Sequence, residues 1–288
     1  MGRPDSGERS PLKSTAVGSF GLHRSNSIGA KFLRPGKYRL KIRNFFQSAG
    51  VRRLEELGIK NTKSWVNYPS EIRHARCTPG GTYAPWLEDQ AFLKVFEAVK
   101  KNTLVDIYRC YELWDIAGQM KSVEGDILEV GVWRGGTGAI LASAVLNTVK
   151  SVFLADTFKG VVKASAMDPR YVGGEHADTS TQVVKSLLAQ LGIESQCQLL
   201  EGVFPDDTSI AIPGKLAMVH CDVDVYQSCK DIIEWCLPRI SVGGVFVFDD
   251  YGFSGCEGVT QYCNELRALD AFRFIYNVNG HAVFTRVY

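Results

Sequence analysis

LAMVHCDVDVY, residues 216–226, is an apolar strand pattern that ends in two aspartates, Asp222 and Asp224. A second stretch, VGGVFVFDDYG at residues 242–252, carries Asp249 and Asp250 near its end. The two stretches lie about one βαβ unit apart, and neighbouring parallel strands bring their carboxyl ends to one edge of a sheet. Carboxylates gathered there would repel one another unless a cation joined them. The pattern therefore predicts a parallel sheet and a site for a hard metal ion.

Short apolar strands alternate with helical patterns along most of the chain, which is typical of a doubly wound α/β fold. Strands are predicted at residues 126–132, 151–155, 196–200, 216–221 and 245–248, with helices at 137–148, between 180 and 192, at 228–237 and at 258–269. Segments 272–277 and 281–286 could form a closing antiparallel pair around Asn279-Gly280. One or two amphipathic helices precede this fold between residues 87 and 116. We thus expect a mostly parallel sheet with an antiparallel closing strand.

The composition of the chain indicates its domain size and its cellular environment. The chain has 288 residues, of which 45% are hydrophobic, enough for one large α/β domain with an extension, or for two small domains. No apolar run approaches the ~20 residues of a membrane helix, and no signal-peptide core follows Met1. The eight cysteines are scattered without C-x-x-C or zinc-type spacing. We therefore expect a cytoplasmic protein with reduced thiols and no membrane span.

The first 64 residues differ in charge from the remainder. They hold 14 Lys/Arg and 4 Asp/Glu, whereas the remainder holds 19 basic and 27 acidic residues. We expect a disordered or loosely packed basic arm at 1–64, followed by a helical lid or cap region at 65–122. Residues 31–53 mix basic and aromatic side chains that could touch an anionic surface or nucleic acid. Packing on its own domain is the simpler interpretation, and the composition also permits an organelle transit peptide.

A glycine-rich turn, ILEVGVWRGGTG at residues 127–138, follows the first strand and opens a helix. Gly131 and Gly135 are four apart, which departs from the G-x-G-x-x-G dinucleotide pattern, and the Gly-Lys-Ser/Thr of a phosphate loop is missing. The form E-x-G-x-x-x-G, which starts at Glu129, resembles the first motif of class I S-adenosylmethionine (SAM)-dependent methyltransferases. Asp156 ends the second strand, where a carboxylate can accept hydrogen bonds from both hydroxyls of a ribose.

Several segments together resemble one family, the macrocin O-methyltransferase (TylF/MycF/NovP) type of metal-dependent sugar O-methyltransferases. The matching pieces, in order, are ILEVGVWRGGTG, LADTFKGV, LLEGVFPDD, HCDVDVYQS, LPRISVGGVFVFDDYG and GCEGV. They run from about Ile127 to Val259, and residues 1–75 fall outside the resemblance. The combination of D-x-D-x-Y, a Gly-Gly strand and Asp-Asp-Tyr is specific.

The resemblance implies a class I methyltransferase fold over residues 123–288 that binds SAM and Mg²⁺. The family's metal ligands map onto Asp222, Asp249 and Asp250, and its general base maps onto Asp224. Its cofactor contacts map onto Glu129, Gly131, Gly135, Asp156, Thr157, Gly202 and Val203. Its lid maps onto Pro85-Trp86 and the 176–178 loop.

The chemistry implied is transfer of a methyl group from SAM to a hydroxyl of a sugar or glycoside. A sugar hydroxyl is a weak nucleophile, so it needs a cation and a base. Asp222 and Asp224 share a strand parity if the strand continues, and so does His220, which is a rival base. A catechol-type methyltransferase and a non-catalytic adaptor that binds through its basic arm are the alternatives. We expect a small-molecule acceptor and no nucleic acid, and the sequence is compatible with a homo-oligomer; it identifies neither the acceptor nor the hydroxyl.

Overall fold

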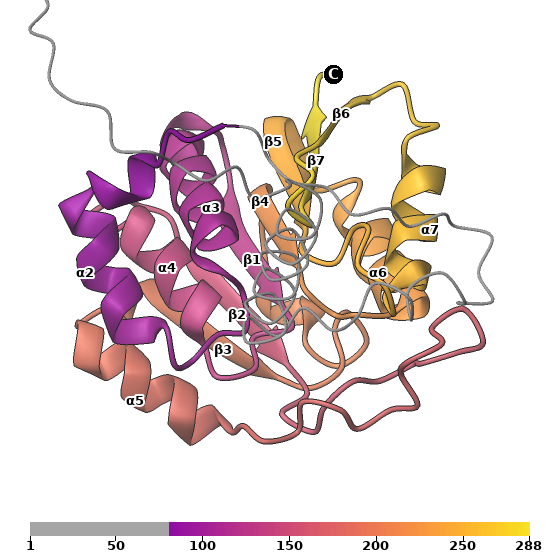
Figure 1. The fold of residues 1–288 in the computed structure, drawn as a ribbon, viewed down its shortest axis with the longest axis horizontal. Coiled ribbons are helices and arrows are strands. Elements are labelled where there is room, and N and C mark those ends of the chain that lie inside the picture. The colour runs from indigo at the N-terminus through magenta and orange to yellow at the C-terminus, as the bar shows by residue number, and fades with distance from the viewer. Residues whose placement is uncertain (1–80) are drawn as a thin grey trace, which may run out of the picture. The chain divides into compact units, whose positions relative to one another are not determined.

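A seven-stranded sheet organises residues 81–288, the part of the chain that the computed structural model describes (Figure 1). The strand order is β3-β2-β1-β4-β5-β7-β6, with β7 antiparallel to both β5 and β6 and the other pairs parallel. The strands are β1 (Asp126–Val130), β2 (Val152–Asp156), β3 (Cys197–Glu201), β4 (Leu216–Cys221), β5 (Ile240–Phe248), β6 (Phe272–Tyr276) and β7 (Ala282–Arg286). The predicted mostly parallel sheet with an antiparallel closing pair is confirmed. The predicted basic arm and the start of the helical region lie outside the described residues.

Helices cover both faces of this sheet. They are α2 (Gln90–Val99), α3 (Ile107–Gln119), α4 (Gly136–Ala144), α5 (Thr181–Leu191), α6 (Tyr226–Cys236) and α7 (Glu257–Leu266). Side chains from α2 to α5 pack in one apolar cluster and those from α6 and α7 in another, on opposite faces of the sheet (Figure 1). None of the helices between residues 81 and 288 is long and apolar enough to cross a membrane.

The central strands are buried on both faces because helices cover both. Every residue of β4 is buried. On β1, Ile127 belongs to the cluster under α3 and α4, whereas its neighbour Leu128 belongs to the cluster under α6 and α7. This alternation explains why these strands read as continuous apolar runs in the sequence.

Strand β5 begins five residues earlier than the sequence indicated. It pairs Ile240 with Leu216 and Val245 with Met218, so extra residues of β5 bulge out between the two pairs. Gly243 lies in this bulge with a φ of +82°, a backbone conformation that favours glycine. The predicted strand began just after the glycine pair, which instead lies within β5 at the bulge.

The helices in front of the sheet are built into the core. Asp89 caps α2 and Asp106 caps α3, each by accepting backbone N–H groups. Phe92 on α2 and Leu113 on α3 are fully buried. The part of the predicted lid or cap region that the structure describes thus also contributes to the apolar core, and its domain boundaries remain a prediction.

Loss of a buried aromatic side chain of β5 should lower the stability of the protein strongly. Phe246 is fully buried, and its replacement by alanine should lower the free energy of unfolding by about 3–5 kcal/mol through lost burial and an unfilled cavity. Val242 lies on the same strand but is 61% exposed, so Val242→Ala should cost less than about 1 kcal/mol. Urea unfolding monitored by circular dichroism measures both. Equal losses in the two variants would contradict the assignment of Phe246 to the core.

Candidate functional site

A cavity of about 320 Å³ opens at the carboxyl edge of the sheet. Its wall includes residues that follow β1, β2, β4 and β5, and it contains both the glycine-rich turn and the aspartate clusters. Gly131, Asp156, Thr157, Gly202, Val203, Asp222, Asp224, Asp249 and Asp250 all line it. Nine of the eleven predicted site residues therefore surround one space, and Glu129 and Gly135 do not line it.

Asp222, Asp249 and Asp250 form a compact carboxylate cluster. Each offers an oxygen, and these atoms all lie within 4.8 Å of one another. Burial and the charges of Asp249 and neighbouring Asp250 raise the pKa of Asp222 well above its usual range, and burial raises that of Asp250 together with the charges of Asp224 and Asp249. Three hard oxygen donors that repel one another fit a divalent cation such as Mg²⁺, whose charge would remove the repulsion.

Asp224 reaches the same wall by a different route from the predicted one. Strand β4 ends at Cys221, and Asp224 has a φ of +64°, so the strand does not continue as a shared parity of Asp222 and Asp224 would require. A turn instead carries Asp224 towards Asp250, whose Oδ2 accepts from the Asp224 backbone N–H at 3.2 Å. Asp224 therefore lies beside Asp250, as expected, although it is carried there by a turn and not by an extended strand.

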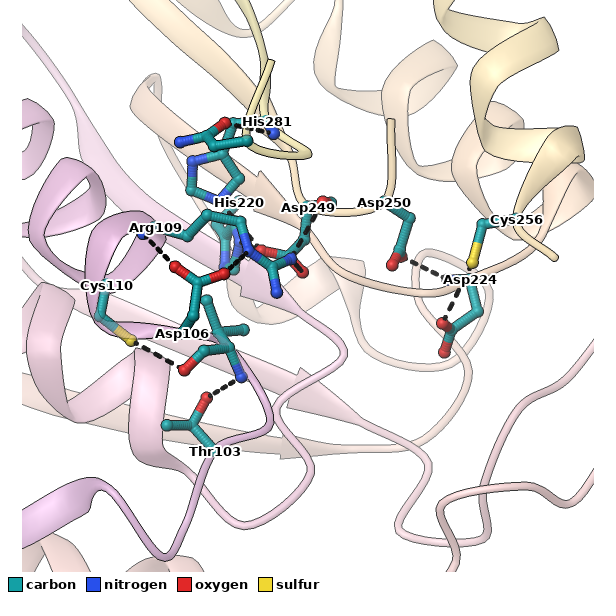
Figure 2. Close-up of polar contacts among 12 residues, drawn as sticks. Thr103, Asp106, Arg109, Cys110, His220, Asp224, Asp249, Asp250, Cys256 and His281 are labelled. Carbon is teal, nitrogen blue, oxygen red and sulfur yellow. Dashed lines mark hydrogen bonds and ion pairs between the residues drawn. The ribbon is translucent and has the colours of Figure 1, made fainter. Parts of the chain in front are cut away.

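The Asp224 carboxylate has its own set of partners. Tyr171 donates its hydroxyl to Oδ1 at 2.5 Å, and the Cys256 thiol lies 3.8 Å from the same oxygen (Figure 2 shows Cys256 beside Asp224). His176 Nε2 lies 3.9 Å from Oδ2. Burial raises the pKa of Asp224, and the hydrogen bond from Tyr171 offsets only part of this effect. A carboxylate whose pKa is raised is a stronger base when it is ionised.

His220, the rival base, lies in the core and does not line the cavity. Its side chain is fully buried, with Nδ1 at 2.8 Å from Glu129 Oε1. Burial lowers the pKa of His220, but Asp249 and Glu129 outweigh it and raise the value to about 9. A histidine that is protonated at neutral pH cannot accept the proton of a hydroxyl, so the geometry favours Asp224. Glu129 is held in the same buried contact, which gives no support to its predicted contact with a cofactor.

The glycine-rich turn is shaped by close packing. Gly131 has a φ of +93°, and a Cβ there would lie 1.6 Å from the backbone oxygen of Asp222, so only glycine fits. The backbone N–H of Trp133 donates to Asp156 Oδ2 at 2.8 Å, which joins the turn to the end of β2. Gly135, with a φ of +87°, is the N-cap of α4. It allows the chain to turn into the helix but does not line the cavity.

Arg109 and His281 belong to the site although the sequence did not single them out for it. The Arg109 guanidinium, on α3, donates to Asp249 Oδ2, and His281 Nε2 lies 2.9 Å from Asp249 Oδ1 (Figure 2). Burial raises the pKa of Asp249, but the imidazoles of His220 and His281 and the charge of Arg109 outweigh it and hold that pKa well below its usual range. Strand β7 pairs Ala282 with Phe248, so His281 stands next to Asp249. If the register between β5 and β7 had been predicted, it would have placed His281 beside Asp249.

The two predicted lid segments differ in their relation to the cavity. His176 lines the cavity, and the nearby Asp178 accepts from Trp133 Nε1 at 2.8 Å. Trp86 does not line the cavity; its ring packs edge-on against Tyr108, with 4.9 Å between the ring centroids.

Comparison with known proteins gives consistent matches. The sequence pattern of the macrocin O-methyltransferase (TylF) family matches residues 102–286. A tetracenomycin-C rhamnosyl 4'-O-methyltransferase of Streptomyces olivaceus is 32% identical over 57% of this chain and 66% of its own length. Mycinamicin III 3''-O-methyltransferase of Micromonospora griseorubida is 32% identical over 49% of this chain and 61% of its own length. The chain thus spans somewhat less than two thirds of these relatives.

Solved structures show the same fold. The O-methyltransferase NovP superposes with a TM-score of 0.58 and 26% identity, over 65% of this chain and 83% of NovP. CalS11, a calicheamicin methyltransferase, superposes with a TM-score of 0.54 over 75% of this chain and 99% of CalS11, at 16% identity, which supports the fold alone.

The carboxylate cluster predicts an unusual dependence of stability on pH. The pKa values of Asp222 and Asp250 are raised in the folded state, so their contribution to stability is present at low pH and is lost as the pH rises through those values. Without divalent cations, the free energy of unfolding of Asp250→Asn should therefore decline less than that of the unmodified protein from about pH 4, the usual aspartate range, towards pH 8. Added Mg²⁺ should reduce the difference.

Asp270→Asn is a matched control because Asp270 is exposed and does not line the cavity. Thermal unfolding in EDTA across this pH range would measure all three proteins. Parallel pH curves for Asp250→Asn and the unmodified protein would contradict the repulsion between the buried carboxylates.

Proposed function

The chain belongs to the macrocin O-methyltransferase (TylF) family, and from that premise we propose that it transfers a methyl group from SAM to a hydroxyl of a sugar or glycoside with the help of Mg²⁺. The observation that carries the proposal is that the glycine-rich turn and the carboxylate cluster share one cavity. The names of the relatives describe methylation of sugar-bearing natural products, which supports a glycoside as the acceptor. A cytoplasmic location is part of the same proposal.

Asp222, Asp249 and Asp250 would hold the metal ion. Their oxygens are the hard donors that Mg²⁺ prefers, and they all lie within 4.8 Å of one another. When bound, Mg²⁺ supplies positive charge that stabilises an alkoxide developing on a coordinated hydroxyl. The buried neighbours of Asp249 keep its carboxylate ionised and oriented, so the ligand set is ready before the acceptor arrives.

Asp224 would be the general base. It lies beside Asp250 but outside the ligand cluster, and its Oδ1 is engaged by Tyr171, which leaves Oδ2 for a proton. SAM, when bound along the glycine-rich turn, would supply the methyl carbon to the hydroxyl oxygen, with S-adenosylhomocysteine as the leaving group. The hydroxyl proton passes to Asp224. Because all groups are fixed around one cavity, little orientational freedom is lost in this step.

The cofactor would lie along the turn after β1. Gly131 gives the close backbone approach, Asp156 and Thr157 offer side chains at the end of β2, and Gly202 and Val203 close the wall after β3. Asp156 accepts hydrogen bonds from the backbone N–H groups of Trp133 and Phe158, which fix its carboxylate at the cavity wall where a ribose hydroxyl would approach it.

Binding and turnover test the proposal directly. The full chain should bind SAM and Mg²⁺ in calorimetry, and should add one methyl group of mass to a member of a panel of deoxysugar glycosides. The turnover should be lost in EDTA and restored by Mg²⁺. Failure to bind either SAM or Mg²⁺ would rule the proposal out, and turnover on catechols but not on glycosides would favour the phenolic alternative.

Substitutions separate the roles of the aspartates. Asp249→Asn and Asp250→Asn should lose the response to Mg²⁺ and most of the turnover, because they remove metal ligands. Asp224→Asn should keep SAM and Mg²⁺ binding but lose turnover by about 10²–10⁴-fold, the usual contribution of a general base. Near-native turnover of Asp224→Asn would show that another group takes the proton. Asp270→Asn is the control that should change neither property.

A further inference from the structure

Helix α3 is linked to both oxygens of one predicted metal ligand, Asp249. Arg109 on α3 donates to Asp249 Oδ2, and its Nε is fixed by Asp106 Oδ2 at 2.9 Å. Three residues further along α3, on the same helix face, Glu112 Oε2 lies 2.6 Å from His281 Nδ1. The other nitrogen of His281 then lies 2.9 Å from Asp249 Oδ1. One helix thus holds Oδ2 directly and Oδ1 through an imidazole.

Glu112 is the point where the closing hairpin is tied to α3. Its carboxylate accepts from the side-chain amides of Asn277 and Asn279, the latter at 3.0 Å, and contacts the His281 imidazole. All three groups come from the turn between β6 and β7 and the residue before β7. The side chain of His281 is fully buried, so its ring has no competing contact with water.

We propose that Glu112 and His281 form a positioning relay that fixes the orientation of the Asp249 carboxylate and thereby sets the affinity of the cavity for its divalent cation. The inference rests on the proposed function, since it takes Asp249 as a metal ligand. Outer carboxylate and histidine partners of this kind orient metal ligands in proteins. The relay connects α3 and the hairpin of β6 and β7 to the carboxylate cluster.

The physical effect is on the freedom of the carboxylate. Asp249 follows β5 directly, and without its partners the side chain could rotate away from Asp222 and Asp250 to reduce the repulsion. A contact at each oxygen prevents this rotation. The lone pairs of Asp249 that are not used by Arg109 and His281 then remain available to a cation.

Metal binding in variants of the full chain tests the relay. Mn²⁺, which takes the same oxygen ligands as Mg²⁺, can be titrated and its free form followed by electron paramagnetic resonance. Glu112→Ala and His281→Ala should each weaken Mn²⁺ binding by about 10–100-fold. Because the two residues act in series, the double variant should bind no more weakly than the single ones.

A conservative variant separates positioning from simple charge. In Glu112→Gln an amide N–H can donate to His281 Nδ1, which leaves the proton on Nε2 for Asp249, so most of the Mn²⁺ affinity should return. Glu265→Gln is the matched control, because Glu265 lies on α7 and accepts only surface hydrogen bonds from Tyr226 and Gln261. SAM affinity and circular dichroism report folding, and if His281→Ala unfolds, the partly exposed Glu112 gives the result.

The outcomes are distinct. Native Mn²⁺ affinity in Glu112→Ala, together with loss of binding in Asp250→Asn, would overturn the relay and leave the proposed function intact. Losses that multiply in the double variant would overturn the serial arrangement. An unmodified protein that binds no Mn²⁺ would overturn the proposed function, and this inference with it.

Discussion

Repulsion between carboxylates is the constraint on which the site depends. The parallel strands β4 and β5 end at the same edge, and the residues that follow them place Asp222, Asp249 and Asp250 within reach of one oxygen-bound ion. In a buried setting this repulsion is only weakly screened. A neighbouring group can reduce this repulsion by adding positive charge or by donating a hydrogen bond. Space between the carboxylates allows a cation to do the same.

Besides His220 on β4, Asp249 has partners from parts of the chain that lie far from the aspartates in the sequence. Arg109 reaches Asp249 from α3, and His281 reaches it from the closing hairpin. The pKa of Asp249 is held low, whereas burial and the neighbouring aspartates raise the pKa values of Asp222 and Asp250. A divalent ion would therefore be stabilised most beside Asp222 and Asp250. Helix α3 thus packs in the apolar core and also contacts the carboxylate cluster.

Much of this could be predicted from the sequence because it depends on local patterns. The mostly parallel, doubly wound sheet follows from strands that alternate with helices, and two apolar runs that end in Asp pairs locate the carboxylate cluster. The contacts that escaped prediction are between distant segments. Arg109 lies 140 positions from Asp249, and His281 reaches it only through the β5–β7 register, which no single segment reveals. The bulge at Gly243 was also missed, because a glycine pair is equally typical of a loop.

The division of roles among the aspartates follows from surroundings more than from chain position. Asp222 and Asp224 are two residues apart and were predicted to face the cavity through strand parity, yet β4 ends before either of them. Asp249 is held ionised between an arginine and a histidine, as a ligand should be. Asp224 instead receives a neutral tyrosine hydroxyl, has a raised pKa and keeps one oxygen close to the half-exposed His176. Asp222 and Asp250 also have raised pKa values, so the partners of Asp224, rather than its pKa, set it apart from the proposed ligands. On this ground Asp224 suits proton transfer and Asp249 suits permanent charge, whichever hydroxyl the cavity receives.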